Sequence, residues 1–442
     1  MSPEDGAADV GAPAGAPAGA PAGVPAPTGA PAPGDSPAQF RLGLLGHGTV
    51  GAAFEALVAE RADHVEAMTG RRPVISGVLT RSRGDFPEIL AGSDAIIELM
   101  GGLEPARTYV REAREAGRHV VTANKQLLSQ DGEELWAVAR GAGVQLRFEA
   151  AVAGVVPVVR VLADALAGAH VERLHGIVNG TTNYILTEMA RTGATYAQAL
   201  AQAQEHGYAE ADPGEDVDGR DAAAKMAILA RLAFGTPVHI DQVVYEGIEH
   251  ITADDLEYAR ELGLELKLLG TAERVQGGLS VRVHPAFLYG GHPLAAVTGP
   301  FNAVTVESPA ITEITMSGPG AGGPQTASAV LGDVLTLLSG AAPVPQPTQR
   351  LEIVKDIESS FYLHLEVADQ PGVLAQVAQL LGLQGASVKS FVQKGLGDNA
   401  RLVMIVHPIL ESRFFAACDL ISRLDFLRSA PRAIRVIEEE FG

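Results

Sequence analysis

The strongest chemical signal in this 442-residue chain is an aspartate and a lysine four positions apart in an apolar stretch. Asp221 and Lys225 share one face of a helix predicted over 221–234, because residues four apart are neighbours on a helix surface. Lys225 is the sole charged residue between Asp221 and Arg231. A buried lysine needs a partner or a function, and this one could give a proton to a reacting oxygen. The alternative is a surface ion pair worth a few tenths of a kcal/mol.

Three further polar segments could contribute to a site. The residues Thr122-Ala-Asn-Lys125 follow a predicted strand, at the sheet edge where ligands bind, although a helix-entry turn with a surface lysine would look the same. Turn and cap chemistry could account for most of Asn179-Gly-Thr-Thr-Asn-Tyr184. The segment 205–221 holds seven carboxylates, among them Glu210.

A glycine-rich turn follows the first predicted strand. Gly46-His-Gly48-Thr49-Val50-Gly51 matches G-x-G-x-x-G and opens a helix. The first glycine permits a tight turn, the second lets the backbone approach a pyrophosphate, and the third allows close helix–strand packing. The first N–H groups of the helix, at Thr49 and Val50, would face the phosphates. An ordinary glycine-rich turn is the alternative, and the strand–turn–helix context favours dinucleotide binding.

The residue after the second strand bears on the choice of cofactor. An NAD enzyme typically places an acid there, which accepts from the ribose 2′-OH. Here Arg81 follows the strand predicted over 74–80. Because a guanidinium suits a 2′-phosphate, NADP is preferred over NAD. A solvated loop arginine is the competing interpretation.

The elements that must position these residues alternate between strand and helix. Strands are predicted at 40–45, 74–80, 94–100, 119–122 and 144–149, with helical stretches between them. That pattern predicts an α/β fold with a parallel, Rossmann-like, doubly wound sheet. The pattern is less regular after 150, as in an α+β unit, and residues 361–438 read strand-helix-strand-strand-helix-strand, a ferredoxin-like order.

Composition excludes several classes of protein. The net charge of −20 disfavours nucleic acid as a partner. No segment has the length and apolarity of a membrane span. The single cysteine, Cys418, cannot form an intrachain disulfide, so we expect a cytoplasmic protein.

Four segments carry a resemblance to a known family. They are Gly176–Leu186, Gly207–Pro213, Asp216–Lys225 and the glycine-rich turn Gly318–Gly323. In this order they resemble homoserine dehydrogenase, in the long form that ends in an ACT regulatory domain.

The resemblance implies an NAD(P)-dependent reduction of L-aspartate 4-semialdehyde to L-homoserine, in threonine, methionine and isoleucine biosynthesis. It assigns the proton donor to Lys225 and substrate positioning to Asp221. It assigns substrate binding to Glu210 and to the backbone at Gly207, places Lys125 near both substrate and nicotinamide, and gives Gly322 a cofactor contact. It also implies a monovalent cation, Na⁺ or K⁺, at Glu149, Val152, Gly154 and Val156, with a side-chain ligand from Glu149 only.

The resemblance further implies an amino-acid effector, with L-threonine the first candidate, bound between ACT domains of a homodimer or homotetramer. The implied organisation is a disordered extension (1–39), an NAD(P)-binding domain (40–150, completed by about 320–340), a catalytic and dimerisation domain (151–319), a linker (341–355) and the ACT domain (356–442). We expect few contacts to cross the Pro-containing linker.

Two other functions compete with this one. An aldehyde dehydrogenase that works through a thiohemiacetal needs a cysteine in its catalytic domain, and Cys418 lies far outside it. An amino-acid sensor with a non-catalytic dehydrogenase-like region would not need the intact set Glu210, Asp221 and Lys225.

Overall fold

The computed structural model describes residues 38–345, 347–394 and 400–437. Residues 1–37, most of the extension expected to be disordered, lie outside the described residues, whereas Ala38 and Gln39 belong to the first strand. None of the helices in the described ranges is long and apolar enough to cross a membrane.

Five parallel strands form the first sheet, in the order β2-β1-β3-β4-β5. The strands are β1 (Ala38–Leu45), β2 (Arg71–Leu79), β3 (Ala95–Glu98), β4 (His119–Thr122) and β5 (Leu146–Arg147), and the helices between them are α1 (Thr49–Thr69), α2 (Phe86–Ala91), α3 (Ala106–Glu115) and α4 (Lys125–Ala142). This confirms the predicted doubly wound sheet. The strand order reverses between β1 and β3, so their carboxyl ends flank the crevice where such sheets bind ligands.

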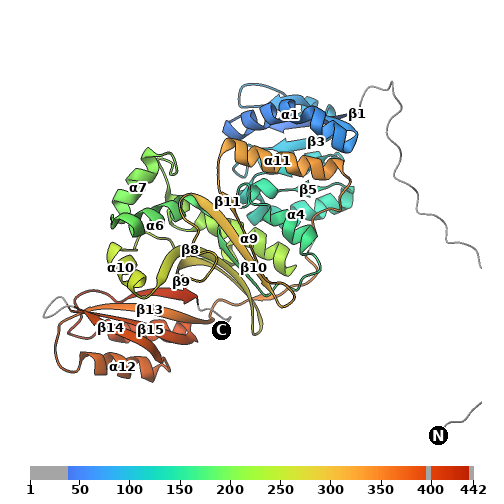
Figure 1. Ribbon diagram of the computed structural model, residues 1–442. Coiled ribbons are helices and arrows are strands. Elements are labelled where there is room, and N and C mark those ends of the chain that lie inside the picture. Colours follow the sequence, from blue (N-terminus) through green and yellow to red (C-terminus); the bar gives the residue numbers. More distant parts are fainter. Residues whose placement is uncertain (1–37, 346, 395–399, 438–442) are drawn as a thin grey trace, which may run out of the picture. The chain divides into compact units, whose positions relative to one another are not determined.

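A helix from much later in the chain completes this layer. Helix α11 (Gly323–Leu338) lies against α1, as Figure 1 shows in orange and blue. Its buried Ala327, Val330 and Val334 share one apolar core with Leu42 and Phe54. The chain therefore returns to the first sheet after forming the second.

The second sheet has five antiparallel strands and carries helix α9 (Arg220–Phe234) on one face. Its strands, in spatial order, are β11 (Thr312–Pro319), β10 (Phe301–Ser308), β6 (Arg173–Ile177), β8 (Leu264–Val275) and β9 (Gly278–Tyr289). Gly270 lets α9 approach, because a Cβ there would lie 2.4 Å from the Met226 side chain. The helical elements around this sheet are α5 (Val158–Arg160), η2 (Val161–Ala165), α6 (Gly180–Thr192), α7 (Tyr196–Glu205), α8 (Gly214–Val217), η3 (Ile240–Gln242) and α10 (Ala253–Glu261).

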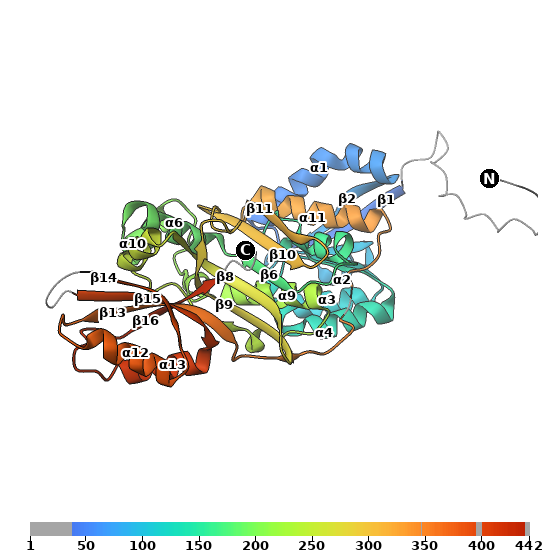
Figure 2. The ribbon, with the colours of Figure 1, turned by 60° about the horizontal axis from the view of Figure 1, so that its bottom comes forward.

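The C-terminal unit has the predicted order strand-helix-strand-strand-helix-strand. It consists of β13 (Glu358–Val367), α12 (Val373–Leu383), β14 (Val388–Lys394), β15 (Ala400–Leu410), α13 (Glu411–Ile421) and β16 (Arg432–Ile437). The strands are antiparallel neighbours in the order β16-β13-β15-β14, and both helices lie on one face of this sheet (Figure 2). Val377 and Phe414 of the helices share a core with Phe361 and Leu363 of β13.

The C-terminal unit is joined to the second sheet along the outer edge of β9. Three short parallel partners divide that edge: β12 (Glu352–Ile353) at Gly278, β7 (Val244–Tyr245) at Arg282, and β16 at Ala286. Strand β12 lies inside the segment predicted as a linker. The expectation that few contacts cross this boundary is wrong, because the two sheets share backbone hydrogen bonds.

A buried ion cluster at the same junction binds the two sheets further. Glu411 Oε1 accepts from Arg282 Nη1 at 2.5 Å and from Arg435 Nε at 2.8 Å. Glu411 Oε2 accepts from Arg435 Nη2 at 2.8 Å. All three side chains are buried. Burial alone would raise the pKa of Glu411, but the two guanidinium groups outweigh it and hold that pKa below its ordinary value.

We predict that Glu411→Leu lowers the free energy of unfolding by about 3–5 kcal/mol, because two buried guanidinium groups would lose their shared carboxylate. Urea denaturation of the full chain measures this. The matched control is Asp419→Ala, also in α13, which breaks the exposed pair with Arg423 and should cost at most about 0.5 kcal/mol. Equal effects of the two changes would show that water reaches the Glu411 cluster.

Candidate active site

One buried carboxylate holds two lysines that come from different parts of the chain. Asp221, in the first turn of α9, is 3% exposed. Its Oδ2 accepts from Lys225 Nζ at 2.7 Å, and its Oδ1 is paired with Lys125 Nζ, at the start of α4. Burial alone would raise the pKa of Asp221, but the two ammonium groups outweigh it and hold that pKa well below its ordinary value. Asp221 is therefore a permanent anion between two cations.

The end of strand β6 fixes the orientation of Lys225. The Val178 carbonyl accepts from Lys225 Nζ at 2.8 Å. An ammonium has three N–H donors, and Asp221 and Val178 engage two of them. Among the described residues the third N–H has no recorded partner, and the side chain is 14% exposed. A ligand oxygen could accept from it.

The next residue, Asn179, arranges two carboxylates. Its Nδ2 donates to Asp216 Oδ1 at 2.7 Å and to Asp221 Oδ2 at 2.9 Å, while its Oδ1 caps α6 through the Thr182 N–H at 2.8 Å. Burial and the charge of Asp221 raise the pKa of Asp216. The polar run 179–184 was noticed in the sequence, but turn chemistry could explain it, so its contact with Asp221 was not predicted.

Lys125 is held in place by the carboxyl ends of β3 and β4. Glu98 accepts from Thr122 Oγ1 at 2.5 Å and from the Met100 N–H at 2.8 Å. Asn124 caps α4 through the Leu127 N–H, and its Nδ2 donates to the Gly102 carbonyl at 2.6 Å. Burial lowers the pKa of Lys125, but Asp221 outweighs this and the pKa is raised. The segment Thr122–Lys125 is thus held by several hydrogen bonds and contributes Lys125 to the site.

The glycine turn has the geometry that a dinucleotide needs. Gly46 has φ of 95°, and a Cβ there would lie 2.6 Å from the Leu99 carbonyl. A Cβ on Gly51 would lie 2.2 Å from the Gly46 carbonyl, whereas one on Gly48 would meet no atom within 4 Å. Gly48 caps α1 without a side-chain bond, so the N–H groups of Thr49 and Val50 remain open to phosphate.

Two other residues expected at the cofactor lie at the edges of this crevice. Arg81 is exposed and lies two residues after the end of β2. Gly322 precedes α11 with φ of 132°, and a Cβ on the next residue, Gly323, would lie 3.1 Å from Thr49. Gly322 therefore lies close to the start of α1.

The segment expected to bind the amino-acid end of the substrate lies beside α6. Gly207 and Glu210 are exposed and follow α7. The Tyr208 carbonyl between them accepts from Thr181 Oγ1 at 2.7 Å, two residues from Asn179. No recorded contact in the described ranges joins Glu210 to the Asp221 cluster, so the protein alone does not bring them together.

The Glu149 side chain of the expected cation site is already hydrogen-bonded within the protein. Its two carboxylate oxygens accept from the N–H groups of Val159 and Arg160 and from Arg160 Nε, at 2.9, 2.9 and 3.0 Å. These donors take three of the roughly four acceptor positions of a carboxylate. The cation site at Glu149, Val152, Gly154 and Val156 stays a prediction.

Comparison with known proteins agrees with this geometry. A family model described as homoserine dehydrogenase, NAD binding domain, matches residues 46–149, and one described as homoserine dehydrogenase matches residues 157–335. A homoserine dehydrogenase of Corynebacterium glutamicum is 40% identical over 432 residues, which cover 91% of this chain and 97% of that protein. One from Mycobacterium tuberculosis is 41% identical over 436 residues, covering 91% of this chain and 99% of that protein.

Solved structures give the same result. The crystal structure of a homoserine dehydrogenase from Thiobacillus denitrificans matches with a TM-score of 0.87 and 36% identity, covering 90% of this chain and 98% of that one. A homoserine dehydrogenase from S. aureus matches with a TM-score of 0.74 and 27% identity over 90% of this chain and 99% of that one. Because these matches span both the dinucleotide turn and the Asp221 cluster, the chain belongs to the homoserine dehydrogenase family of oxidoreductases.

Proposed function

We propose that this chain reduces L-aspartate 4-semialdehyde to L-homoserine and prefers NADP to NAD. The observation that carries the proposal is the Asp221 cluster. Its buried anion holds Lys125, at the carboxyl edge of the dinucleotide-binding sheet, and Lys225, on the helix of the second sheet. A reactive carbonyl between cofactor and α9 would meet an ammonium N–H.

Lys225 acts as the general acid in this proposal. A bound nicotinamide cofactor supplies the hydride for aldehyde reduction. The alkoxide that develops needs a proton, and the N–H of Lys225 that Asp221 and Val178 leave free can give it. Since those two acceptors fix the other N–H directions, the donor is oriented before the substrate arrives. Water replenishes the proton through the exposed part of the side chain.

The other polar residues bind and orient the substrate. Lys125 stabilises negative charge on the substrate oxygen from the cofactor side, and Asp221 keeps both ammonium groups in place. Glu210, with the backbone at Gly207, accepts from the α-ammonium of the amino acid. Because Glu210 makes no contact with the Asp221 cluster by itself, we infer that the substrate bridges the two.

The cofactor is held by the glycine turn and its surroundings. The pyrophosphate would be held by Gly46, Gly48, Thr49, Val50 and Gly51, and Gly322, close to the start of α1, would contact the cofactor. Arg81 contacts the 2′-phosphate of NADP. Its exposure two residues after the end of β2 supports this role.

The C-terminal unit is proposed to be an ACT domain that senses L-threonine. Support comes from its strand order and from the turn Asp369-Gln-Pro-Gly372 between β13 and α12. A cavity of about 520 Å³ lies at this turn, lined by residues 367–374, Gln393 and Leu402. In a homodimer or homotetramer the same turns would meet between subunits.

The proposed division of the chain assigns residues 40–150 with 320–340 to cofactor binding, 151–319 to substrate binding and 356–442 to regulation. The enzyme is proposed to be cytoplasmic.

We predict that Lys225→Ala lowers kcat by on the order of 10²–10⁴-fold, because general acid catalysis is lost. The assay follows L-homoserine oxidation by NADP through nicotinamide absorbance. Arg220→Ala, an exposed change five positions earlier in the same helix, is the control and should stay within about twofold of the parent. Parent-like kcat in Lys225→Ala would leave the lysine with a structural role only, and an inactive parent would refute the proposed reaction.

We predict that Arg81→Asp shifts the ratio of kcat/KM for NADP over NAD towards NAD by on the order of 10-fold or more, since it exchanges a 2′-phosphate partner for a 2′-OH acceptor. Steady-state kinetics with both cofactors measure the ratio. Arg83→Asp, two residues on in the same exposed loop, makes the same charge change and is the control. If only Arg83→Asp changed the ratio of kcat/KM, the 2′-phosphate contact would belong to Arg83 and not to Arg81.

We predict that L-threonine inhibits the full chain and that Asp369→Ala weakens this inhibition by on the order of 10-fold, because the change removes a carboxylate from the turn cavity. Initial rates over a threonine titration give the inhibition constant. Asp425→Ala, which removes a carboxylate elsewhere in the C-terminal unit, should leave the inhibition constant unchanged. Inhibition that Asp369→Ala does not alter would place the effector outside this turn.

A further inference from the structure

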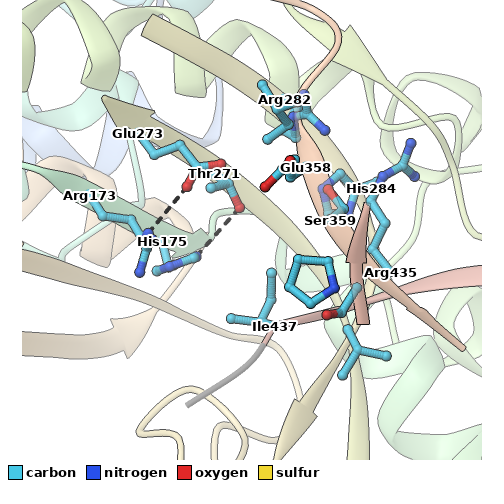
Figure 3. A pocket seen from close by; sticks show the side chains of 14 residues that line it. Arg173, His175, Thr271, Glu273, Arg282, His284, Glu358, Ser359, Arg435 and Ile437 are labelled. Carbon is cyan, nitrogen blue, oxygen red and sulfur yellow. Dashed lines mark hydrogen bonds and ion pairs between the residues drawn. The ribbon is translucent and has the colours of Figure 1, made fainter. Parts of the chain in front are cut away.

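A polar cavity lies where the second sheet meets the C-terminal unit. Its volume is about 130 Å³, and Figure 3 shows side chains from both sheets around it. At about 30 Å³ per liquid water molecule, it has room for about four waters or one small solute. Neither the proposed chemistry nor the proposed effector turn uses this cavity.

One wall of the cavity is a row of side chains on the face of the second sheet opposite α9. His175 of β6 pairs in register with Thr271 of β8, and Thr271 pairs with Arg282 of β9. The Thr271 hydroxyl lies 3.4 Å from His175 Nδ1. The other wall comes from β13 and β16 and includes Glu358, Ser359 and Arg435.

The buried ring of His175 has a nitrogen atom that makes no hydrogen bond. His175 is 2% exposed, and its Nε2 has no hydrogen-bond partner among the described residues, although Glu307 Oε1 lies 3.7 Å from it. Burial lowers the pKa of His175 well below its ordinary value, so the ring is neutral near pH 7. A buried polar atom without a partner costs about 1–3 kcal/mol, which makes a ligand or an ordered water at this position favourable.

The cavity lining carries charges of both signs, with Arg173, Arg282 and Arg435 against Glu273 and Glu358. Arg282 and Arg435 are both buried and share the single buried carboxylate of Glu411, while the second carboxylate on Arg435, Glu246, is 41% exposed. Arg282 has five N–H donors. Three of these reach Glu411 Oε1, Ser280 Oγ and the Lys355 carbonyl, which leaves two with no hydrogen-bond partner in the part of the chain that the structure describes. An anionic group in the cavity would accept from them.

A carboxylate that could take a cation lies on the opposite wall. Glu358 opens β13, lines the cavity and is exposed. A ligand that places a carboxylate at Arg282 and an ammonium at Glu358 would satisfy both walls. Small α-amino acids carry these two groups one carbon apart and fit the volume.

We propose that this cavity is a binding site for a small α-amino acid, separate from the active site and from the 367–374 turn. His175 Nε2 and the Thr271 hydroxyl hydrogen-bond its polar side chain or carboxylate, and Arg282 balances its negative charge. Strand β6 leads from His175 to Val178, whose carbonyl orients Lys225. A bound amino acid would thus alter turnover through β6. This effect on turnover rests on the proposed reaction, but the binding of the amino acid does not depend on it.

Isothermal titration of the full chain with glycine, L-alanine, L-serine and L-threonine tests the proposal. We expect at least one of them to bind, and Thr271→Val, which keeps the side-chain volume, to weaken that binding at least 10-fold. His175→Phe, which fills the cavity, should abolish it. Asp369→Ala, the change at the turn, should leave this binding intact, and Thr271→Val should keep the basal kcat within about twofold.

Three titration results would overturn the proposal: no binding of any of the four amino acids, binding that Thr271→Val leaves unchanged, or binding that only Asp369→Ala removes. A crystal structure with the bound amino acid decides the placement, and density for water alone in the cavity also overturns it. Because titration needs no turnover, an inactive parent that still binds would refute the proposed reaction and leave this site standing.

Discussion

The charge on Asp221 is the constraint on which the arrangement of the active site depends. Its two oxygens are divided between a lysine from the dinucleotide-binding sheet and a lysine from the substrate-binding sheet. Without that anion the two ammonium groups would repel each other across a partly buried space. The same ion cluster thus sets the chemistry and holds together the two layers that must act on one substrate.

The backbone around Asp221 makes this arrangement rigid. Gly270 lets α9 lie close to the second sheet, so that Lys225 reaches the Val178 carbonyl at the end of β6. Asn179 then ties Asp216 and Asp221 to the start of α6. Side chains held by several bonds keep their direction when a ligand binds, which is what an oriented proton donor requires.

The sequence was most informative where a function depends on local geometry. The turn Gly46–Gly51, the alternating strands and the Asp221–Lys225 spacing each need only a few consecutive residues, and the structure bears out the turn, the parallel sheet and the ion pair. Contacts between distant segments could not be inferred in this way. The pairing of Lys125 with Asp221 and the joining of β16 to β9 depend on how whole layers pack. Glu149 shows the same limit: the resemblance implied a cation ligand there, and the N–H donors around its carboxylate are visible only in three dimensions.

The shared edge of β9 has a consequence for how the chain folds during synthesis. Its three partners, β7, β12 and β16, lie before, after and far after it in sequence. When β9 has left the ribosome, β16 has not yet been synthesised. The part of the β9 edge that pairs with β16 therefore keeps unpaired N–H and C=O groups until then. Parallel pairing between distant segments is slow to form. We therefore expect nascent chains to depend on chaperones until the last strand emerges, and premature termination to favour aggregation over a smaller working enzyme.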